Sequence, residues 1–387
     1  MLDFSDTKTA FAIKSDRDIR RAYFMYKIIS YPWLVKIANP LLKVASAIRL
    51  PINWIVKPTV YAQFCGGETI EDCTPVIERI KKGNVHAILD YSVEGSEEEK
   101  AINEALEETL RVIDYASTND NIPFTVFKPT AFAKSKALEI LSTSQNPDDE
   151  SLREGEKFRN RVEQLCKKAY GYDIPIMIDA EDSWYQEFID KVVLEMMSRY
   201  NKKRPIVFNT YQMYRKDRLS RLKQDHHQAR KEKFYLGAKF VRGAYMEKER
   251  ERAELMGYED PIQPDKAATD RDYNLALKYT LENLEDTAVF NGTHNEESSR
   301  FMAELMDELK IPRDDHRCWF SQLYGMSDHI SFNLAAEGYN VAKYVPYGPV
   351  RFVLPYLMRR AEENTSVKGQ TSRELMLLKK ERNRRKR

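Results

Sequence analysis

The chain has 387 residues, of which 42% are hydrophobic, and this is enough for one large or two ordinary globular domains with an apolar core. Its 62 Lys and Arg residues nearly balance its 60 Asp and Glu residues, so no strong overall charge indicates a nucleic-acid partner. The four cysteines show neither a CxxC pair nor a Cys/His ligand spacing, which argues against a disulfide framework and a zinc site. We therefore expect a soluble protein of a reducing compartment, without a metal.

Residues 1–85 are predicted to form an N-terminal helical extension. Acidic residues interrupt the first 20 positions and no apolar signal-peptide core follows, so we expect no targeting peptide. The most lipophilic stretch, residues 31–57, is interrupted by basic residues and prolines and falls short of the ~20 apolar residues that a bilayer span requires. We interpret it as a helix packed against the main domain, with a helix lying on a membrane surface as the alternative.

Eight short apolar runs recur from residue 86 onward, separated by longer charged stretches with helical periodicity. This alternation predicts an α/β fold, and eight is the number of parallel strands that closes a (β/α)8 barrel, here over residues 86–365. A doubly wound open sheet is the competing fold, but it would usually show a GxGxxG turn, which the sequence lacks. The runs are HAILDYS at 86–92, PFTVFKP at 123–129, IPIMIDAE at 174–181, PIVFNTY at 205–211, AKFVRGAY at 238–245, TAVFNGTH at 287–294, CWFSQL at 318–323 and NVAKYVPY at 340–347.

The last stretch, residues 366–387, is predicted to be a basic C-terminal tail. Residues 379–387 include seven basic residues and one acidic residue, and we expect them to be solvated rather than packed. Contact with an anionic membrane or a nucleic acid is the alternative. His226 and His227, in a charged run, are likewise expected to be solvated residues of a helix.

Polar residues follow most of the eight runs, where the active site of such a barrel lies. A single lysine there is usually a surface residue, but three cations that converge suit an anionic ligand. His294 is as plausible a ligand contact as a structural hydrogen bonder. The set comprises Lys128, Asp179, Gln212, Lys239, Arg242, Thr293, His294, Gln322 and Tyr344.

The helix expected after the eighth run carries an arginine pair, Arg359 and Arg360. Helical periodicity places Val350, Val353, Leu354, Leu357 and Ala361 on a packed face, and Phe352, Tyr356, Arg359, Arg360 and Glu363 on the opposite one. Two adjacent guanidinium groups can hold a carboxylate, with Glu363 orienting them. The alternative is a surface ion pair worth about 0.3 to 0.5 kcal/mol. Pro355 must lie near the first turn or kink this helix.

With these residues assembled, the chain resembles the proline dehydrogenase family over about residues 64–364. The resemblance implies a barrel that holds FAD without a Rossmann domain and oxidises L-proline to Δ1-pyrroline-5-carboxylate by hydride transfer, the first step of proline catabolism. The segments that carry it are FCGGETIEDC, FKPTAFA, MIDAE, FNTYQMY, KFVRGAYMEKER, GTHNEES, QLYGMSDH and, most specifically, YVPYGPVRFVLPYLMRRAEEN.

The resemblance also implies roles for single residues, motif by motif. Arg359 and Arg360 would bind the proline carboxylate, and Arg242 and Lys266 are candidates for the FAD phosphates. The residues implied for substrate are Lys128, Tyr344, Tyr356, Arg359 and Arg360. Those implied for the cofactor site are Asp179, Gln212, Lys239, Val241, Arg242, Gly243, Ala244, Tyr245, Lys266, Thr293 and His294, with Glu363 orienting the arginine pair.

Two positions refine the resemblance. Bifunctional bacterial members of the family have Arg at the position of Lys239 and Lys at that of Arg242, so the chain is similar to the monofunctional, eukaryote-like branch. Which of the two contacts the flavin ring stays open. Hydroxyproline-oxidising relatives have a smaller residue at the position of Tyr344, so this tyrosine favours unsubstituted L-proline, with hydroxyproline dehydrogenase as the alternative function.

The resemblance further implies a quinone-type electron acceptor, which would give residues 31–57 and the basic tail a use at a membrane. We therefore expect a cytoplasmic protein with peripheral attachment to the inner face of the cytoplasmic membrane, and no nucleic-acid partner. A non-enzymatic barrel that acts through its basic tail is the remaining alternative.

Overall fold

A computed structural model describes residues 2–47, 52–92, 97–366 and 370–386, with side chains described except at 39, 43–47, 362–366 and 370–372. The chain divides into two compact units. Met1–Val93 and Gln322–Arg387 form one, here called the terminal unit, and Glu94–Ser321 form the other, the central unit.

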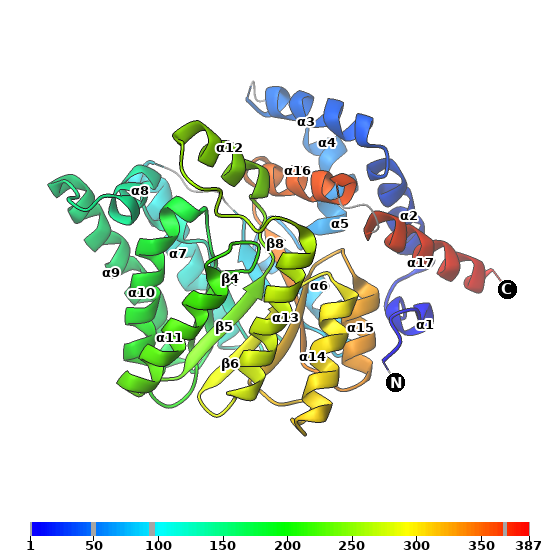
Figure 1. The fold of residues 1–387 in the computed structure, drawn as a ribbon. Helices are drawn as coiled ribbons and strands as arrows, with labels where there is room; N and C mark the ends of the chain where they lie inside the picture. Colours follow the sequence, from blue (N-terminus) through cyan, green and yellow to red (C-terminus); the bar gives the residue numbers. More distant parts are fainter. Residues whose placement is uncertain (1, 48–51, 93–96, 367–369, 387) are drawn as a thin grey trace. The chain divides into compact units, whose positions relative to one another are not determined.

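Eight parallel strands form a nearly closed barrel (Figure 1), in the order β1-β8-β7-β6-β5-β4-β3-β2. The predicted (β/α)8 fold is confirmed, because each predicted apolar run overlaps one strand. Most strand residues are buried, as expected of parallel strands covered by helices. The strands are β1 (His86–Tyr91), β2 (Thr125–Phe127), β3 (Ile176–Ile178), β4 (Val207–Gln212), β5 (Leu236–Val241), β6 (Thr287–Gly292), β7 (Cys318–Leu323) and β8 (Val341–Tyr347).

Helices of the central unit follow its strands, and α10, α11 and α13 contact β4, β5 or β6 (Figure 1). Several begin at a side-chain cap; for example, Asp265 accepts a hydrogen bond from the amide of Ala268, and Asn295 from that of Ser298. These helices are α7 (Glu99–Ala116), α8 (Ser135–Thr143), α9 (Asp149–Gly171), α10 (Ser183–Tyr200), α11 (Arg218–Glu232), α12 (Met246–Met256), α13 (Lys266–Glu282) and α14 (Glu296–Glu308), with the short 3-10 helix η3 (Pro129–Phe132) after β2.

The terminal unit is helical outside its strands. Ser15 and Asp18 form a capping box at the start of α2. Its helices are α1 (Thr7–Ala10), α2 (Asp16–Ile29), α3 (Pro32–Ala47), α4 (Asn53–Val56), the π-helical η1 (Lys57–Tyr61), α5 (Ala62–Phe64), η2 (Glu71–Cys73), α6 (Thr74–Lys81), α15 (Asp328–Ala336), α16 (Val350–Ser366) and α17 (Gln370–Arg385).

The segment expected to be a solvated tail is instead helix α17, packed within the terminal unit. Leu377 and Leu378 are each 1% exposed and lie in one cluster with Phe11 of the N-terminal segment. Glu381 is buried and accepts hydrogen bonds from Arg384 and Arg385, which hold its pKa at about 2 against the effect of burial. The expectation was wrong because the apolar residues precede the basic run, and part of that run is neutralised by a buried carboxylate.

His226 also differs from expectation. Its ring is 1% exposed, with Nδ1 2.8 Å from the hydroxyl of Tyr279 and Nε2 2.7 Å from a carboxylate oxygen of Asp286. Only its neighbour His227 is exposed. The helical period turns the first of the two histidines towards α13 and the second outwards.

Candidate active site

The interior of the central unit's part of the barrel contains a layer of aromatic rings. The ring of Phe124 lies 5.2 to 5.6 Å, centroid to centroid, from three other rings, which belong to strands that are not all neighbours. These contacts therefore cross the barrel interior and close it at this level. The three rings are Phe208 on β4, Phe290 on β6 and Trp319 on β7.

Two residues further along β4 and β7 the interior becomes polar. Because side chains alternate along a strand, Thr210 and Ser321 face the same side as Phe208 and Trp319. Their hydroxyl oxygens are buried and have no hydrogen-bond partner among the described residues. A buried hydroxyl group without a partner is costly, so this layer has donors available to a bound polar group.

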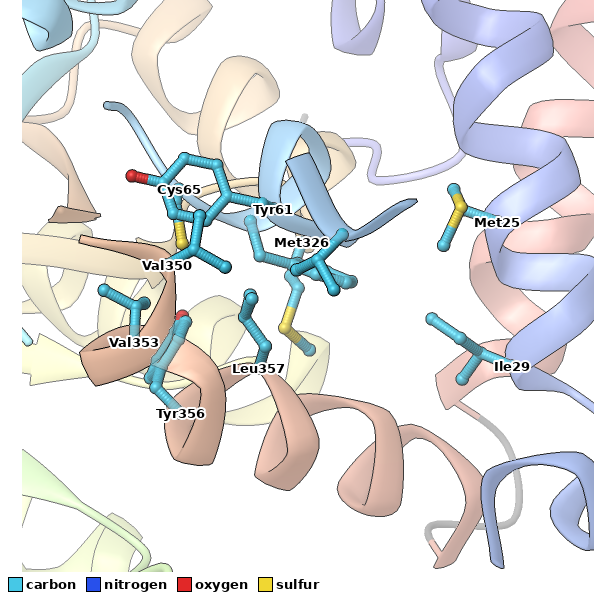
Figure 2. Close-up of a cluster of buried hydrophobic side chains, with 11 residues drawn as sticks. Met25, Ile29, Tyr61, Cys65, Met326, Val350, Val353, Tyr356 and Leu357 are labelled. Atoms are coloured by element: carbon cyan, nitrogen blue, oxygen red, sulfur yellow. The ribbon is translucent and has the colours of Figure 1, made fainter. Parts of the chain in front are cut away.

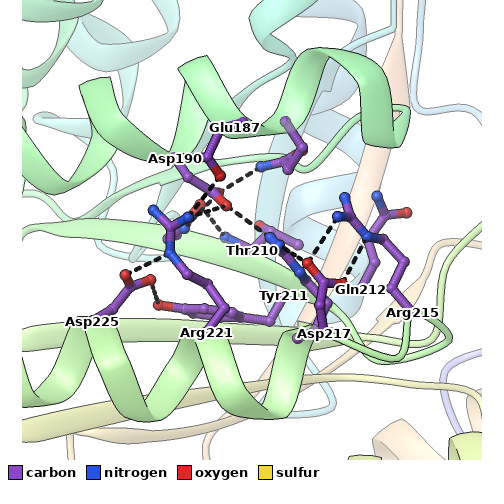
Figure 3. A network of polar contacts seen from close by, with 12 residues as sticks. Glu187, Asp190, Thr210, Tyr211, Gln212, Arg215, Asp217, Arg221 and Asp225 are labelled. Atoms are coloured by element: carbon purple, nitrogen blue, oxygen red, sulfur yellow. Dashed lines mark hydrogen bonds and ion pairs between the residues drawn. The ribbon is translucent and has the colours of Figure 1, made fainter. Parts of the chain in front are cut away.

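The outward side chains of β4 hold this strand in place (Figure 3). The Asn209 amide donates to Asp190 on α10 at 3.0 Å, and the Tyr211 hydroxyl donates to Asp225 on α11 at 2.8 Å. Asp190 in turn pairs with the buried Arg218 at 2.7 Å. A connected buried network of this kind rigidifies the strand, so the inward residues of β4 have fixed positions.

Lys239 and Asp179, both predicted site residues, form an ion pair inside the central unit. Lys239 is on β5 and 4% exposed, and its Nζ lies 2.5 Å from Oδ1 of Asp179, which directly follows β3. Gln212, at the end of β4, donates from Nε2 to the carbonyl of Glu181 at 2.6 Å. Residues on or just after β3, β4 and β5 thus lie close together.

Glu181 belongs to the same group of residues but was not predicted. It is 5% exposed and accepts a hydrogen bond of 2.8 Å from the Thr130 hydroxyl. Burial raises the pKa of Glu181 to about 7, against the opposing effects of Thr130 and of the positive charge of Lys128. The strand period was a usable signal, since Glu181 lies two residues after Asp179 in IDAE.

Arg242, directly after the end of β5, is a second positively charged residue of the candidate site. Its Nε donates to Asp270 at 2.8 Å, and its other nitrogens donate to Thr293 at 2.6 Å and to Ser298 at 3.0 Å. Lys266 pairs with the same Asp270, but its side chain is 67% exposed. The predicted phosphate candidates therefore meet near the N-terminal turns of α13 and α14, whose helix dipoles favour a negative charge.

The segment between Lys239 and α12 is shaped by Gly243. Its φ is +128°, and a Cβ atom there would lie 2.5 Å from the ring of Tyr214, so only glycine fits. Val241 and Tyr245 are half-buried, Gly243 and Ala244 are exposed, and His294 is half-buried next to Thr293.

The predicted substrate residues, apart from Lys128, belong to the terminal unit. Tyr344 on β8 is 7% exposed, and on α16 Tyr356 is 5% and Arg360 8% exposed, while Arg359 is half-buried. The guanidinium carbon of Arg360 lies 5.1 Å from the centre of the Tyr356 ring. This stacking holds Arg360 beside an aromatic face. The side chain of Glu363 lies outside the described residues.

Helix α16 is anchored by the cluster shown in Figure 2, in which its side chains meet residues of α2, η1 and the α5 region. The apolar face was predicted correctly, since Val350, Val353 and Leu357 are at most 2% exposed. Tyr356 differs from expectation, because it is buried in this cluster and not on an open polar face. Pro355 lies inside the helix, beyond its first turn.

No helix within the described ranges is long and apolar enough to span a bilayer. Among the described side chains, no group of three or more His, Cys, Asp or Glu residues could hold a metal ion.

The chain is similar to several known proteins. A sequence model of the family described as proline dehydrogenase matches residues 73–373. The chain is 32% identical to proline dehydrogenase 1, mitochondrial, of Dictyostelium discoideum, over 97% of this chain and 74% of that protein. It is 34% identical to hydroxyproline dehydrogenase of Xenopus laevis, over 99% and 90%. The solved structure of proline utilization A (PutA) from Bdellovibrio bacteriovorus matches with a TM-score of 0.74 at 19% identity, over 96% of this chain and 40% of that one, and supports the fold alone.

Proposed function

The chain belongs to the proline dehydrogenase family, and from this premise we propose that it oxidises L-proline to Δ1-pyrroline-5-carboxylate with FAD as the hydride acceptor, in the first step of proline catabolism. The observation that carries the proposal is the buried pair of Lys239 and Asp179 at 2.5 Å, set in a polar layer above an aromatic one. No nucleophilic side chain is needed for this reaction, because the residues only hold and orient donor and acceptor.

The polar layer suits a flavin. When bound, FAD supplies a two-electron acceptor for a hydride from the carbon next to the proline nitrogen. Lys239 would place a positive charge beside the ring system, and Asp179 keeps that lysine oriented. The hydroxyl groups of Thr210 and Ser321 are further donors for the ring's polar atoms.

We propose that the two cations of KFVRGAY, Lys239 and Arg242, have different tasks, and that only one of them contacts the flavin ring. Lys239 lies within the barrel interior and would serve the flavin ring. Arg242, already held by Asp270 and Thr293 beside the starts of α13 and α14, would serve the phosphates together with Lys266. Val241, Gly243, Ala244, Tyr245 and His294 would line the rest of the cofactor site.

For the substrate, we propose that Arg359 and Arg360 bind the proline carboxylate. The ring of Tyr356 orients Arg360 from one face, and a guanidinium group can contact a carboxylate through two parallel hydrogen bonds. Glu363 would orient the pair, and Lys128 and Tyr344 would complete the contacts. Unsubstituted L-proline is the proposed substrate, and the similarity to a protein named hydroxyproline dehydrogenase makes 4-hydroxyproline the alternative.

We further propose that the electrons pass to a quinone-type acceptor at a membrane, with the protein attached peripherally to its cytoplasmic face. The deciding experiment for the reaction is an anaerobic visible spectrum of the purified protein before and after L-proline is added. Oxidised-flavin absorption that bleaches with L-proline would support the proposal. A colourless protein that does not bind added FAD would contradict it.

A further inference from the structure

Residues 19–67, here called the acid-free segment, are unusual in charge. They contain no Asp or Glu, although the whole chain has 60 such residues, and they contain seven Lys or Arg residues. The segment covers nearly all of α2 and the whole of α3, α4, η1 and α5. Arg21 and Lys57 pair with acidic residues just outside the segment, Asp18 and Glu68. The segment itself is positively charged, whereas the chain as a whole has a formal charge of only +2.

Helix α3 exposes large apolar side chains along one line. Trp33, Ile37 and Leu41 are 60%, 54% and 64% exposed, and their spacing of four residues places them above one another on a helix. We call these three residues the apolar stripe. The other side of α3 packs within the terminal unit, since Val35 is buried and Leu42 packs against the cluster of Figure 2. Packing within the terminal unit therefore does not account for the stripe.

Neighbouring helices of the acid-free segment extend the exposed apolar surface. Trp54 and Ile55 on α4 are 74% and 49% exposed, and Phe24, on α2, which contacts α3, is 60% exposed. Figure 1 draws α3 and α4 at the same end of the terminal unit. The other two tryptophans of the chain, Trp184 and Trp319, are less than 10% exposed. Exposed tryptophans among basic residues are typical of surfaces that enter the membrane interface.

Basic side chains lie among these apolar residues. Lys27 and Lys36 are exposed and form no ion pair with any described side chain. On α17, Arg384 and Arg385 are bound to Glu381, whereas Lys379, Lys380 and Lys386 are exposed. Positive charge is therefore not confined to the C-terminal helix, and it also lies on the helices that carry the exposed apolar residues.

We propose that the acid-free segment docks the protein onto an anionic phospholipid bilayer, with α3 in the plane of the interface and the apolar stripe between headgroups and acyl chains. A second copy of the chain fits less well, because a two-fold contact would place this positive surface against itself without any acidic residue to compensate. This surface would provide the peripheral membrane attachment included in the proposed function. It uses no residue of the proposed active site, so membrane binding and proline oxidation can be tested separately.

The test is sedimentation of the full-length protein with vesicles of phosphatidylcholine alone or mixed with phosphatidylglycerol. We expect binding to the anionic vesicles that weakens with added salt and little binding to the neutral ones. The triple variant Trp33→Ser/Ile37→Ser/Leu41→Ser should bind about tenfold more weakly or worse. The charge variant Lys27→Glu/Lys36→Glu should lose binding to the anionic vesicles.

A matched control replaces three exposed leucines of the central unit, Leu152, Leu255 and Leu309, by Ser, and should bind as the unmodified protein does. The melting temperature and the activity with a water-soluble acceptor show whether each variant is folded, and bleaching by proline tests the proposed function separately. Absence of sedimentation with anionic vesicles, or wild-type binding by both variants, would overturn the proposal. So would a dimer in solution that the stripe variant converts to a monomer, because the surface would then belong to a second copy.

Discussion

The ammonium group of Lys239 and the carboxylate of Asp179 are 2.5 Å apart although they come from β5 and from the end of β3. Both strands pair with β4, so the two side chains meet across the inner face of that strand. Removing one partner of a buried ion pair is strongly destabilising, because it leaves the other charge uncompensated. The pair therefore fixes the position of the Lys239 ammonium group in the barrel interior.

Replacing Lys239 by Met should impair both stability and flavin binding. The substitution leaves Asp179 largely buried without its partner, which we expect to cost about 3 kcal/mol of unfolding free energy, and it removes the charge proposed to face the flavin. Urea unfolding and the ratio of flavin to protein in the visible spectrum measure the two effects. The double variant Lys239→Met/Asp179→Asn should recover part of the stability but not the flavin. A single variant with unchanged stability and flavin content would refute the assignment.

Glu181 should make stability depend on pH. Its folded-state pKa of about 7 exceeds the ordinary value of 4.5, so the folded protein binds more protons than the unfolded chain between these values. The contribution of this carboxyl group is therefore complete below pH 4.5, is lost as the pH rises to 7, and amounts to roughly 3 kcal/mol.

The substitution Glu181→Gln removes this titration. Compared with the unmodified protein, the variant should gain relative stability between pH 5 and pH 8, as measured by urea unfolding at both values. Glu308→Gln, at an exposed glutamate of α14, is the control and should leave the difference unchanged. The same pH dependence in the Glu181→Gln variant would show that another group is responsible.

Replacing either arginine of the pair by Met should weaken proline binding. Loss of a charged partner for the carboxylate is expected to cost about 2 to 5 kcal/mol in kcat/KM, mainly through a higher KM, with the flavin retained. Arg360→Met should also lower the melting temperature, because Arg360 is buried and stacked on Tyr356, whereas Arg359→Met should not. Arg351→Met, at an exposed position of the same helix, is the control. Unchanged proline kinetics in both variants would exclude the carboxylate clamp.

Tyr344 should decide between proline and 4-hydroxyproline. The unmodified protein should have a much lower kcat/KM for 4-hydroxyproline, and Tyr344→Ser should raise that value by making room for the added hydroxyl group. Because Tyr344 is 7% exposed, the truncation should also destabilise the protein by about 3 kcal/mol. Steady-state kinetics with both substrates provide the measurement, and equal efficiencies in the unmodified protein would reject the idea.

The sequence by itself determined the barrel. Parallel strands that are buried on both faces read as short apolar runs, and this local signal located β1 to β8 and the polar residues that follow them. It also identified the apolar face of α16, because helical periodicity is a property of neighbouring residues.

Only the tertiary structure decided which of these residues meet. The pairing of Lys239 with Asp179, the direction of Arg242 towards Asp270 and the raised pKa of Glu181 all depend on groups far away in the chain. The same holds for α17, whose Leu377 and Leu378 are buried by residues from the other end of the chain. Burial, pKa and ion pairing are properties of neighbours in space, and a local pattern cannot specify them.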